Sequence, residues 1–216
     1  MDSMGRLAPA RSSQVTTMAL HLLQLIARFE GIDDVETAHA FFRTKLPTVA
    51  PEAYLHTVYK PAPAVLMSEV SAELKLPGSV VDFYHCCNGA HLFVNALSIF
   101  GCVASETTIN RSDRFKLLPF DVREINRELK AKFARGNLVA IAFYSYDGSL
   151  VCVERATGET ICFVGDALSK ERTRWKSIDE WLSQEIQRIS FLFDQRGNRL
   201  VEKENLLPGI EPSRVN

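Results

Sequence analysis

Residues 76–101 read LPGSVVDFYHCCNGAHLFVNALSIFG, and this stretch decides the expected fold. Leu76-Pro77 marks a helix start, and about two turns of apolar residues at helical spacing follow it. Asn88-Gly89 ends that helix, because both residue types tolerate the left-handed backbone conformation. The apolar run over residues 91–101 is then predicted to be a strand. The stretch therefore indicates a helix, a turn and a strand of a scaffold rather than a catalytic motif.

The composition indicates one globular domain. The chain has 216 residues, of which 46% are hydrophobic and 24% are charged. This is enough to bury a sizeable core without help from a metal or disulfides. Its 25 basic and 26 acidic residues are mixed along the chain, so the charge pattern indicates neither a nucleic-acid partner nor an anionic lipid surface.

The cysteines point to a reducing compartment. There are five of them, an odd number, and they lie in apolar runs at positions that lack the regular spacing of a secreted disulfide framework: Cys86, Cys87, Cys102, Cys152 and Cys162. We interpret them as small buried hydrophobic residues. The sequence therefore predicts a cytoplasmic protein.

An apolar run over residues 18–27 resembles a secretory signal at first sight. His21 and Gln24 interrupt it, and Arg28 and Glu30 continue the pattern of an amphipathic helix. The run is also shorter than the roughly 20 residues that a membrane-spanning helix needs. We therefore expect a core helix and no membrane span.

The N-terminal part of the chain is predicted to be helical after a disordered start, residues 1–13. Asp33 and Asp34 supply N-capping carboxylates for the second of its helices, which Pro47 ends within a few residues. The three expected helices cover residues 13–29, 35–42 and 51–59. Residues 14–63 thus form an N-terminal helical extension packed on the core, and Pro61-Ala62-Pro63 is its boundary.

The core domain is predicted to cover residues 64–204. Amphipathic spacing indicates helices over residues 64–74 and 120–134. Asp147-Gly148 joins two β-branched and aromatic runs, residues 138–146 and 150–155, in a pattern typical of a hairpin with a type I′ turn. A turn at Thr157-Gly158 leads to a third strand, residues 160–164, so these strands form an antiparallel meander.

A closing helix is expected over residues 177–193. Ser177 is its N-cap, Glu180 is the capping-box partner, and Trp181 faces the core. A short strand, residues 199–202, and a loose tail, residues 205–216, complete the chain. The expected fold class is α+β, with a central antiparallel sheet, flanking helices and the N-terminal helical extension.

The order of these elements resembles the SUKH superfamily, which includes the fungal cell-wall assembly regulator and many bacterial immunity proteins. The resemblance is carried by a helix bearing Glu69 or Glu73 and by five later motifs in the order of the family: Leu76-Pro77, Asn88-Gly89, Phe100-Gly101, Asp147-Gly148 and Trp181-Leu182. Each motif alone is weak, and the order lends them weight. The resemblance implies an α+β fold and a role in binding other proteins.

An enzymatic interpretation finds little support in the spacing of reactive residues. His85, Cys86, Cys87 and His91 form the richest cluster, but successive helical residues point about 100° apart and Gly89 breaks the helix between them. No glycine-rich phosphate loop, serine nucleophile elbow or His-Glu metalloprotease helix occurs in the sequence. We therefore expect no metal, no cofactor and no catalytic residues.

Candidate partner-binding residues lie in three predicted loops, at residues 88–91, 146–149 and 172–176. Trp175 is flanked by basic residues and is expected to be exposed as an anchor for a partner. The full set is Asn88, His91, Tyr146, Asp147, Arg172, Arg174 and Trp175.

The function that follows is that of a protein-binding module, specifically an immunity protein that neutralises a cognate toxin of the nuclease or deaminase type. Such inhibition covers a site by surface complementarity. A regulatory scaffold of the same fold and a small-molecule enzyme are the alternatives. The sequence leaves open the identity of the partner and the oligomeric state.

Overall fold

The computed structural model describes most of the chain from residue 33 onward. The described residues are 22, 24, 29, 33–46, 49, 53–104, 118–132, 136–165 and 170–210. Apart from Leu22, Gln24 and Phe29, the predicted first helix lies outside them, as do the segment predicted to be disordered, residues 1–13, and residues 211–216 of the predicted tail.

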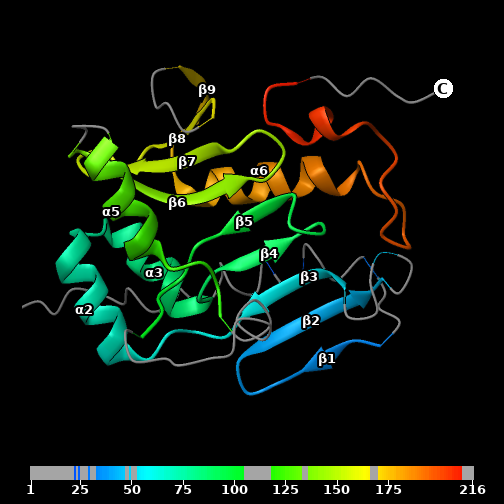
Figure 1. Cartoon of the computed structure of the whole chain (residues 1–216), viewed down its shortest axis with the longest axis horizontal. Coiled ribbons are helices and arrows are strands. Elements are labelled where there is room, and N and C mark those ends of the chain that lie inside the picture. Colours follow the sequence, from blue (N-terminus) through cyan, green and yellow to red (C-terminus); the bar gives the residue numbers. More distant parts are fainter. Residues whose placement is uncertain are drawn as a thin grey trace, which may run out of the picture.

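One antiparallel sheet dominates the described residues, and its nine strands lie side by side in the order of the sequence (Figure 1). These strands are β1 Val35–Glu36, β2 Ala40–Lys45, β3 Tyr54–Tyr59, β4 Ala90–Leu92, β5 Leu97–Ile99, β6 Leu138–Tyr144, β7 Ser149–Glu154, β8 Thr160–Phe163 and β9 Glu171–Trp175. The predicted α+β class with a central antiparallel sheet is confirmed.

The helices flank this sheet. They are α2 Ala64–Leu74, α3 Gly78–Cys86, α5 Val122–Lys132 and α6 Ile178–Ser190, followed by the short 3-10 helix η1 Lys203–Leu206. In Figure 1, α2, α3 and α5 gather at one end of the molecule, and α6 passes behind β6 and β7. The predicted helices of the core domain are thus confirmed. No helix among the described residues is long and apolar enough to cross a lipid bilayer.

The N-terminal part of the sheet corrects the sequence interpretation. Residues 35–42 and 51–59 were expected to be helical, but the described residues there form β1, β2 and β3. Along β2 every second residue, starting at Ala40, is buried, and Phe42 pairs with Thr57 of β3. Pairing with β3, the next strand in the chain, therefore overrides the local helical spacing, and this region extends the core sheet.

The apolar run over residues 91–101 is a hairpin instead of the single predicted strand. Phe93, Val94 and Asn95 all have positive φ angles and turn the chain between β4 and β5, so that Leu92 pairs with Leu97. The predicted hairpin between β6 and β7 is confirmed, but its turn is not of type I′. Of the residues in its loop, 145–148, Gly148 has a positive φ and Asp147 does not.

The closing helix α6 begins as predicted. The Ser177 hydroxyl accepts a hydrogen bond from the Glu180 backbone N–H at 3.2 Å. The Glu180 carboxylate reaches back to the N–H of Lys176 at 2.6 Å, one residue before the N-cap. Trp181 on the inner face of α6 is fully buried, which confirms its predicted place in the core.

The chain after α6 is more ordered than predicted. The expected strand, residues 199–202, is an isolated bridge between Phe193 and Arg199. Residues 205–208, expected to be part of a loose tail, are buried. The Arg188 guanidinium on α6 donates to the carbonyls of Asn205 at 3.0 Å and Leu206 at 2.8 Å. These bonds and the burial of Leu206 and Leu207 fasten this segment to the core.

Candidate partner-binding surface

Asn88 belongs to a structural junction rather than to an exposed loop. Its side-chain amide pairs with one backbone unit, accepting from Cys102 N at 2.7 Å and donating to Cys102 O at 2.9 Å. Gly89 has a φ of +84°, and a Cβ there would lie 2.6 Å from the Ile99 carbonyl. A Cβ at Gly101 would in turn clash with the Asn88 carbonyl. The Asn88-Gly89 and Phe100-Gly101 motifs therefore pack directly on each other.

His91 is buried among aromatic rings. Its Nδ1 lies 3.0 Å from the Ser98 hydroxyl, and its ring meets those of Tyr59 and Phe120 edge to face. Burial lowers the pKa of His91 to about 4, so the ring is neutral near pH 7. With 6% of its surface exposed, His91 offers a partner almost nothing to contact, contrary to expectation.

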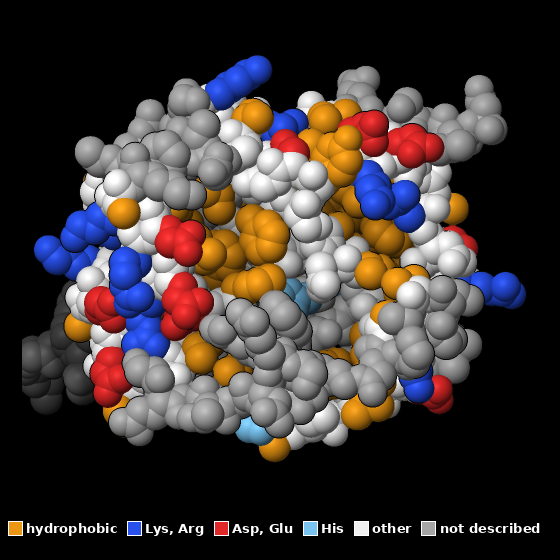
Figure 2. All heavy atoms as spheres, in the orientation of Figure 1, with side chains coloured by type: hydrophobic (Ala, Val, Ile, Leu, Met, Phe, Trp, Pro, Cys, Tyr) orange, Lys and Arg blue, Asp and Glu red, His pale blue; other side chains and the backbone are white. Residues whose placement is uncertain are grey.

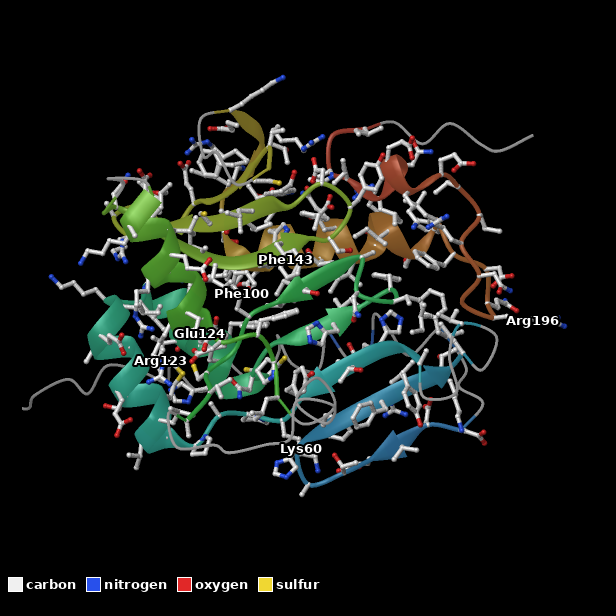
Figure 3. All side chains as sticks on the ribbon, viewed as in Figure 1. Lys60, Phe100, Arg123, Glu124, Phe143 and Arg196 are labelled. Carbon is white, nitrogen blue, oxygen red and sulfur yellow. The ribbon has the colours of Figure 1, made fainter. Side chains whose placement is uncertain are left out.

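The aromatic cluster around His91 continues to Phe100 and Phe143, whose rings stack at 5.7 Å. Figure 3 shows both side chains at the middle of the visible face, and Figure 2 shows apolar side chains gathered in the same region. Contacts with this cluster explain why His91, which was predicted to lie in a partner-binding loop, is buried.

The thiols near this junction are not activated. Burial raises the pKa of Cys87 to about 12 and that of Cys102 to about 12, so both stay protonated at neutral pH. His85 is exposed on α3, whereas Cys87 and His91 are buried. Within the described residues, no three His, Cys, Asp or Glu side chains are grouped to hold a metal ion.

Tyr146 is the exposed aromatic residue at the predicted sites. It lies in the loop between β6 and β7 with 47% of its surface accessible. The neighbouring Asp147 accepts from Ser149 N at 2.9 Å and from the Arg172 guanidinium at 2.7 Å. Arg172 is the extra residue of a β-bulge in β9, a feature that redirects side chains. The ion pair thus fixes the Tyr146 loop against β9.

Arg174 makes ion pairs of its own on β9. Its guanidinium contacts Glu159 at 2.5 Å and Glu171 at 2.7 Å while staying 40% exposed. We call Tyr146, Asp147 and Arg172, which the Asp147–Arg172 ion pair holds together, the loop–β9 surface. The structure therefore brings together three of the seven predicted site residues.

Trp175 does not join the loop–β9 surface. It pairs with Thr160 of β8 and is 7% exposed, so its predicted exposure is wrong. Neighbouring residues of a strand point to opposite faces. The basic residues beside Trp175 are exposed for that reason, and their exposure carries no information about the tryptophan.

A second feature of the surface was missed by sequence reasoning. A cavity of about 440 Å³ lies between the end of α2, α5 and the β6–β7 hairpin. We call it the basic cleft, because the described residues that line it include five basic side chains: Lys75, Arg123, Arg127, Lys130 and Arg155. Figure 3 shows Arg123 where α5 faces α2, and Figure 2 shows basic and acidic side chains intermixed over these helices.

The sequence holds a signal for part of this cleft. Arg123, Arg127 and Lys130 recur at four- and three-residue spacing, which places them on one stripe of α5. Glu73, one of the two glutamates that carry the family resemblance, also lines the cleft, 3.9 Å from Arg123 and 3.8 Å from Arg127. Arg155 reaches the cleft only through the long-range pairing of strands, and no local spacing in the sequence indicates its place there.

A central antiparallel sheet with flanking helices is the arrangement that the resemblance to the SUKH superfamily implied. Residues 65–184, more than half of the chain, match the sequence model of the SMI1 / KNR4 family (SUKH-1). The chain belongs to this family, which includes toxin-immunity proteins and regulators and is generally non-enzymatic. No curated protein matches the chain.

Proposed function

We propose that this chain is a non-enzymatic protein-binding module that neutralises a toxin of the nuclease or deaminase type by binding it directly. The observation that carries the proposal is the exposure of Tyr146 on a loop that the Asp147–Arg172 ion pair holds in place. Membership in a family that includes toxin-immunity proteins supports the same conclusion.

The loop–β9 surface has the composition of a binding surface. Tyrosine and arginine are enriched at the energetic centres of protein interfaces. The Asp147–Arg172 pair has side-chain exposures of 23% and 16%, so the geometry of the loop is largely set before a partner arrives. Binding then costs less conformational entropy than ordering a free loop would.

The charges on β9 suit fast association. Arg174 and its two carboxylate partners keep charges of both signs at the solvent-exposed side of β9. Charges at the rim of an interface raise the association rate and disfavour wrong partners more than they raise the affinity. A toxin would be inhibited when the interface covers its active site or the path of its substrate.

The test is co-expression with the toxin candidate encoded beside this gene, with growth and co-purification as readouts. The wild-type chain should restore growth and co-purify with the toxin. Tyr146→Ala should weaken binding by at least about tenfold, since it removes an aromatic anchor. Val65→Ala is the control, because it truncates a side chain that is 73% exposed on α2.

Two outcomes would contradict the proposal. If no neighbouring toxin candidate is neutralised by the wild-type chain, the immunity role is wrong. If neutralisation occurs and Tyr146→Ala behaves like Val65→Ala, the chain binds through another surface. The fold of each variant is checked by its unfolding temperature.

A further inference from the structure

The basic cleft has the size and lining of a small-molecule site. Its volume of about 440 Å³ is bounded by α2, α5 and the β6–β7 hairpin and lies within the range of about 300–1,000 Å³ for ligand pockets. Apolar side chains from helix and sheet contribute to its lining: Leu74, Leu129, Leu138, Ala140 and Cys152. A ligand with an organic portion would find apolar surface there.

The charges of the cleft are not balanced. Arg123 lies 3.4 Å from the Asp121 carboxylate, and Arg127 lies 3.8 Å from that of Glu73, so these two cations have anionic neighbours. The other three lining cations have no ion pair with a carboxylate in the described part of the chain: Lys75, Lys130 and Arg155. The chain carries a net charge of -1 overall, so this positive site is a local feature.

Arg155 is the fixed cation of the group. Its guanidinium donates to the carbonyls of Leu74 and Leu138, each at 2.8 Å, and to that of Gly136. These carbonyls hold the side chain in place but do not neutralise its charge. Partial burial lowers the pKa of Arg155, so its charged form would gain from an anion beside it.

We propose that the basic cleft binds a small organic phosphate. A phosphate group carries up to two negative charges and several strong acceptor oxygens, which suits a fixed arginine with two exposed lysines. The apolar lining favours a phosphate that bears an organic group. The concave shape favours a small molecule over a flat protein surface. This ligand site lies outside the loop–β9 surface and goes beyond the function proposed above.

The experiment measures binding to the full chain by calorimetry and by thermal unfolding. The probes are AMP, ADP, a pentose phosphate and a hexose phosphate. Inorganic phosphate and the unphosphorylated compounds form separate arms. At least one organic phosphate should bind saturably, and more tightly than either inorganic phosphate or its own unphosphorylated form.

Matched variants locate the site. Lys75→Gln/Lys130→Gln removes two lining cations that have no carboxylate partner among the described residues, and it should weaken binding at least about tenfold. Lys170→Gln/Lys203→Gln makes the same charge change at two exposed lysines outside the cleft. This control pair should bind like the wild type.

Three results would overturn the proposal: binding of no organic phosphate, binding of inorganic phosphate with equal affinity, or equal loss in the two double variants. The second result would mean an adventitious ion only, and the third a general charge effect. None of them bears on toxin neutralisation, which is read from growth and co-purification and depends on Tyr146.

Discussion

Gly89 and Gly101 are positions where the backbone itself leaves no room for a side chain. Each glycine faces main-chain carbonyls of the other's segment, at Ile99 and Asn88. Backbone atoms cannot move aside as the end of a flexible side chain can. The Asn88 amide closes the same junction by pairing with Cys102. The two motifs are therefore a single packing unit formed by α3 and the end of β5.

We predict that Gly89→Ala lowers the free energy of unfolding by at least about 3 kcal/mol, because it adds a backbone clash to a strained positive φ. Gly78→Ala is the control, since a Cβ there meets nothing within 4 Å. Gly78 opens α3, where alanine is neutral or stabilises by up to about 1 kcal/mol. Urea unfolding of both variants is the measurement, and equal midpoints would contradict the junction.

A second prediction at this scale concerns pH and His91. The pKa of His91 is about 4 in the folded chain and returns to its ordinary 6.5 on unfolding. Between these values the unfolded chain binds more protons than the folded one, so stability falls as the pH is lowered through this window. The loss from this residue should approach about 3 kcal/mol at pH 4.

The measurement for His91 is the free energy of unfolding at a series of pH values. His91→Gln should flatten the slope between pH 6.5 and pH 4 relative to the wild type. If His91→Gln keeps the wild-type slope, another group accounts for the acid sensitivity.

At the scale of single residues, sequence reasoning is reliable where a backbone requirement is local. Ser177 and Gly148 were identified because a helix cap and a turn depend on a few neighbouring residues. Trp175 and His91 were misjudged, since their burial depends on which strand lies beside them. Charged neighbours in the sequence do not expose a strand residue whose face is opposite to theirs.

The Ser177 N-cap of helix α6 is predicted to contribute measurably to the stability of the protein. Ser177→Ala removes the acceptor for Glu180 N and should cost about 1 kcal/mol of stability. Ser183→Ala, at a position inside the helix, should change stability by less than about 0.5 kcal/mol, because alanine has the higher helix propensity. Thermal unfolding distinguishes the two, and equal effects would show that the cap is dispensable.

Among the elements, the helices of the core domain were predictable and β1 to β3 were not. The helices between residues 64 and 190 carry apolar stripes that indicate their period locally. In β2 the buried positions are Ala40, Phe42 and Thr44. Ala40 is small and Thr44 is polar, so the sequence does not show the clear alternation of apolar and polar residues that indicates a strand. Adjacent Phe41 and Phe42 also fit a helical stripe, and only pairing with β3 decides between the two.

Across the whole molecule, Glu185 links the sheet, α6 and the chain after it. Its carboxylate accepts from the Tyr144 hydroxyl at 2.8 Å and from Arg188 at 2.8 and 2.9 Å. Arg188 in turn holds two carbonyls of η1. Burial raises the pKa of Tyr144, and the nearby Glu185 carboxylate raises it further, so the phenol remains a donor. This network was not evident from the sequence, since its members are far apart in the chain.

We predict that Arg188→Gln lowers stability by about 3 kcal/mol, because it leaves the Glu185 charge buried without its partner. Hydrogen exchange of the backbone amides in residues 203–207 should also become faster. Arg196→Gln is the control, as Arg196 points to solvent in Figure 3, and it should stay within about 0.5 kcal/mol of the wild type. Unchanged exchange in Arg188→Gln would contradict the link to η1.

The fold class and the Tyr146-Asp147 turn followed from local patterns, whereas only the basic stripe on α5 gave a local signal for the basic cleft. Tyr146 and Asp147 lie in one turn that the sequence marks clearly. The cleft needs α2, α5 and the β6–β7 hairpin in place at once. A site assembled from three elements is set by tertiary packing, which a single sequence does not display.

The order of the sheet also governs how the protein can be made. Within the described residues, each strand after β1 pairs with the strand synthesised just before it, so a nascent chain leaving the ribosome can bury each new sheet edge as soon as the next strand emerges. Strand β9, at one edge of the described sheet, carries Glu171, Arg172 and Arg174. Charged side chains discourage pairing with other chains, so this edge is protected against pairing with a second molecule.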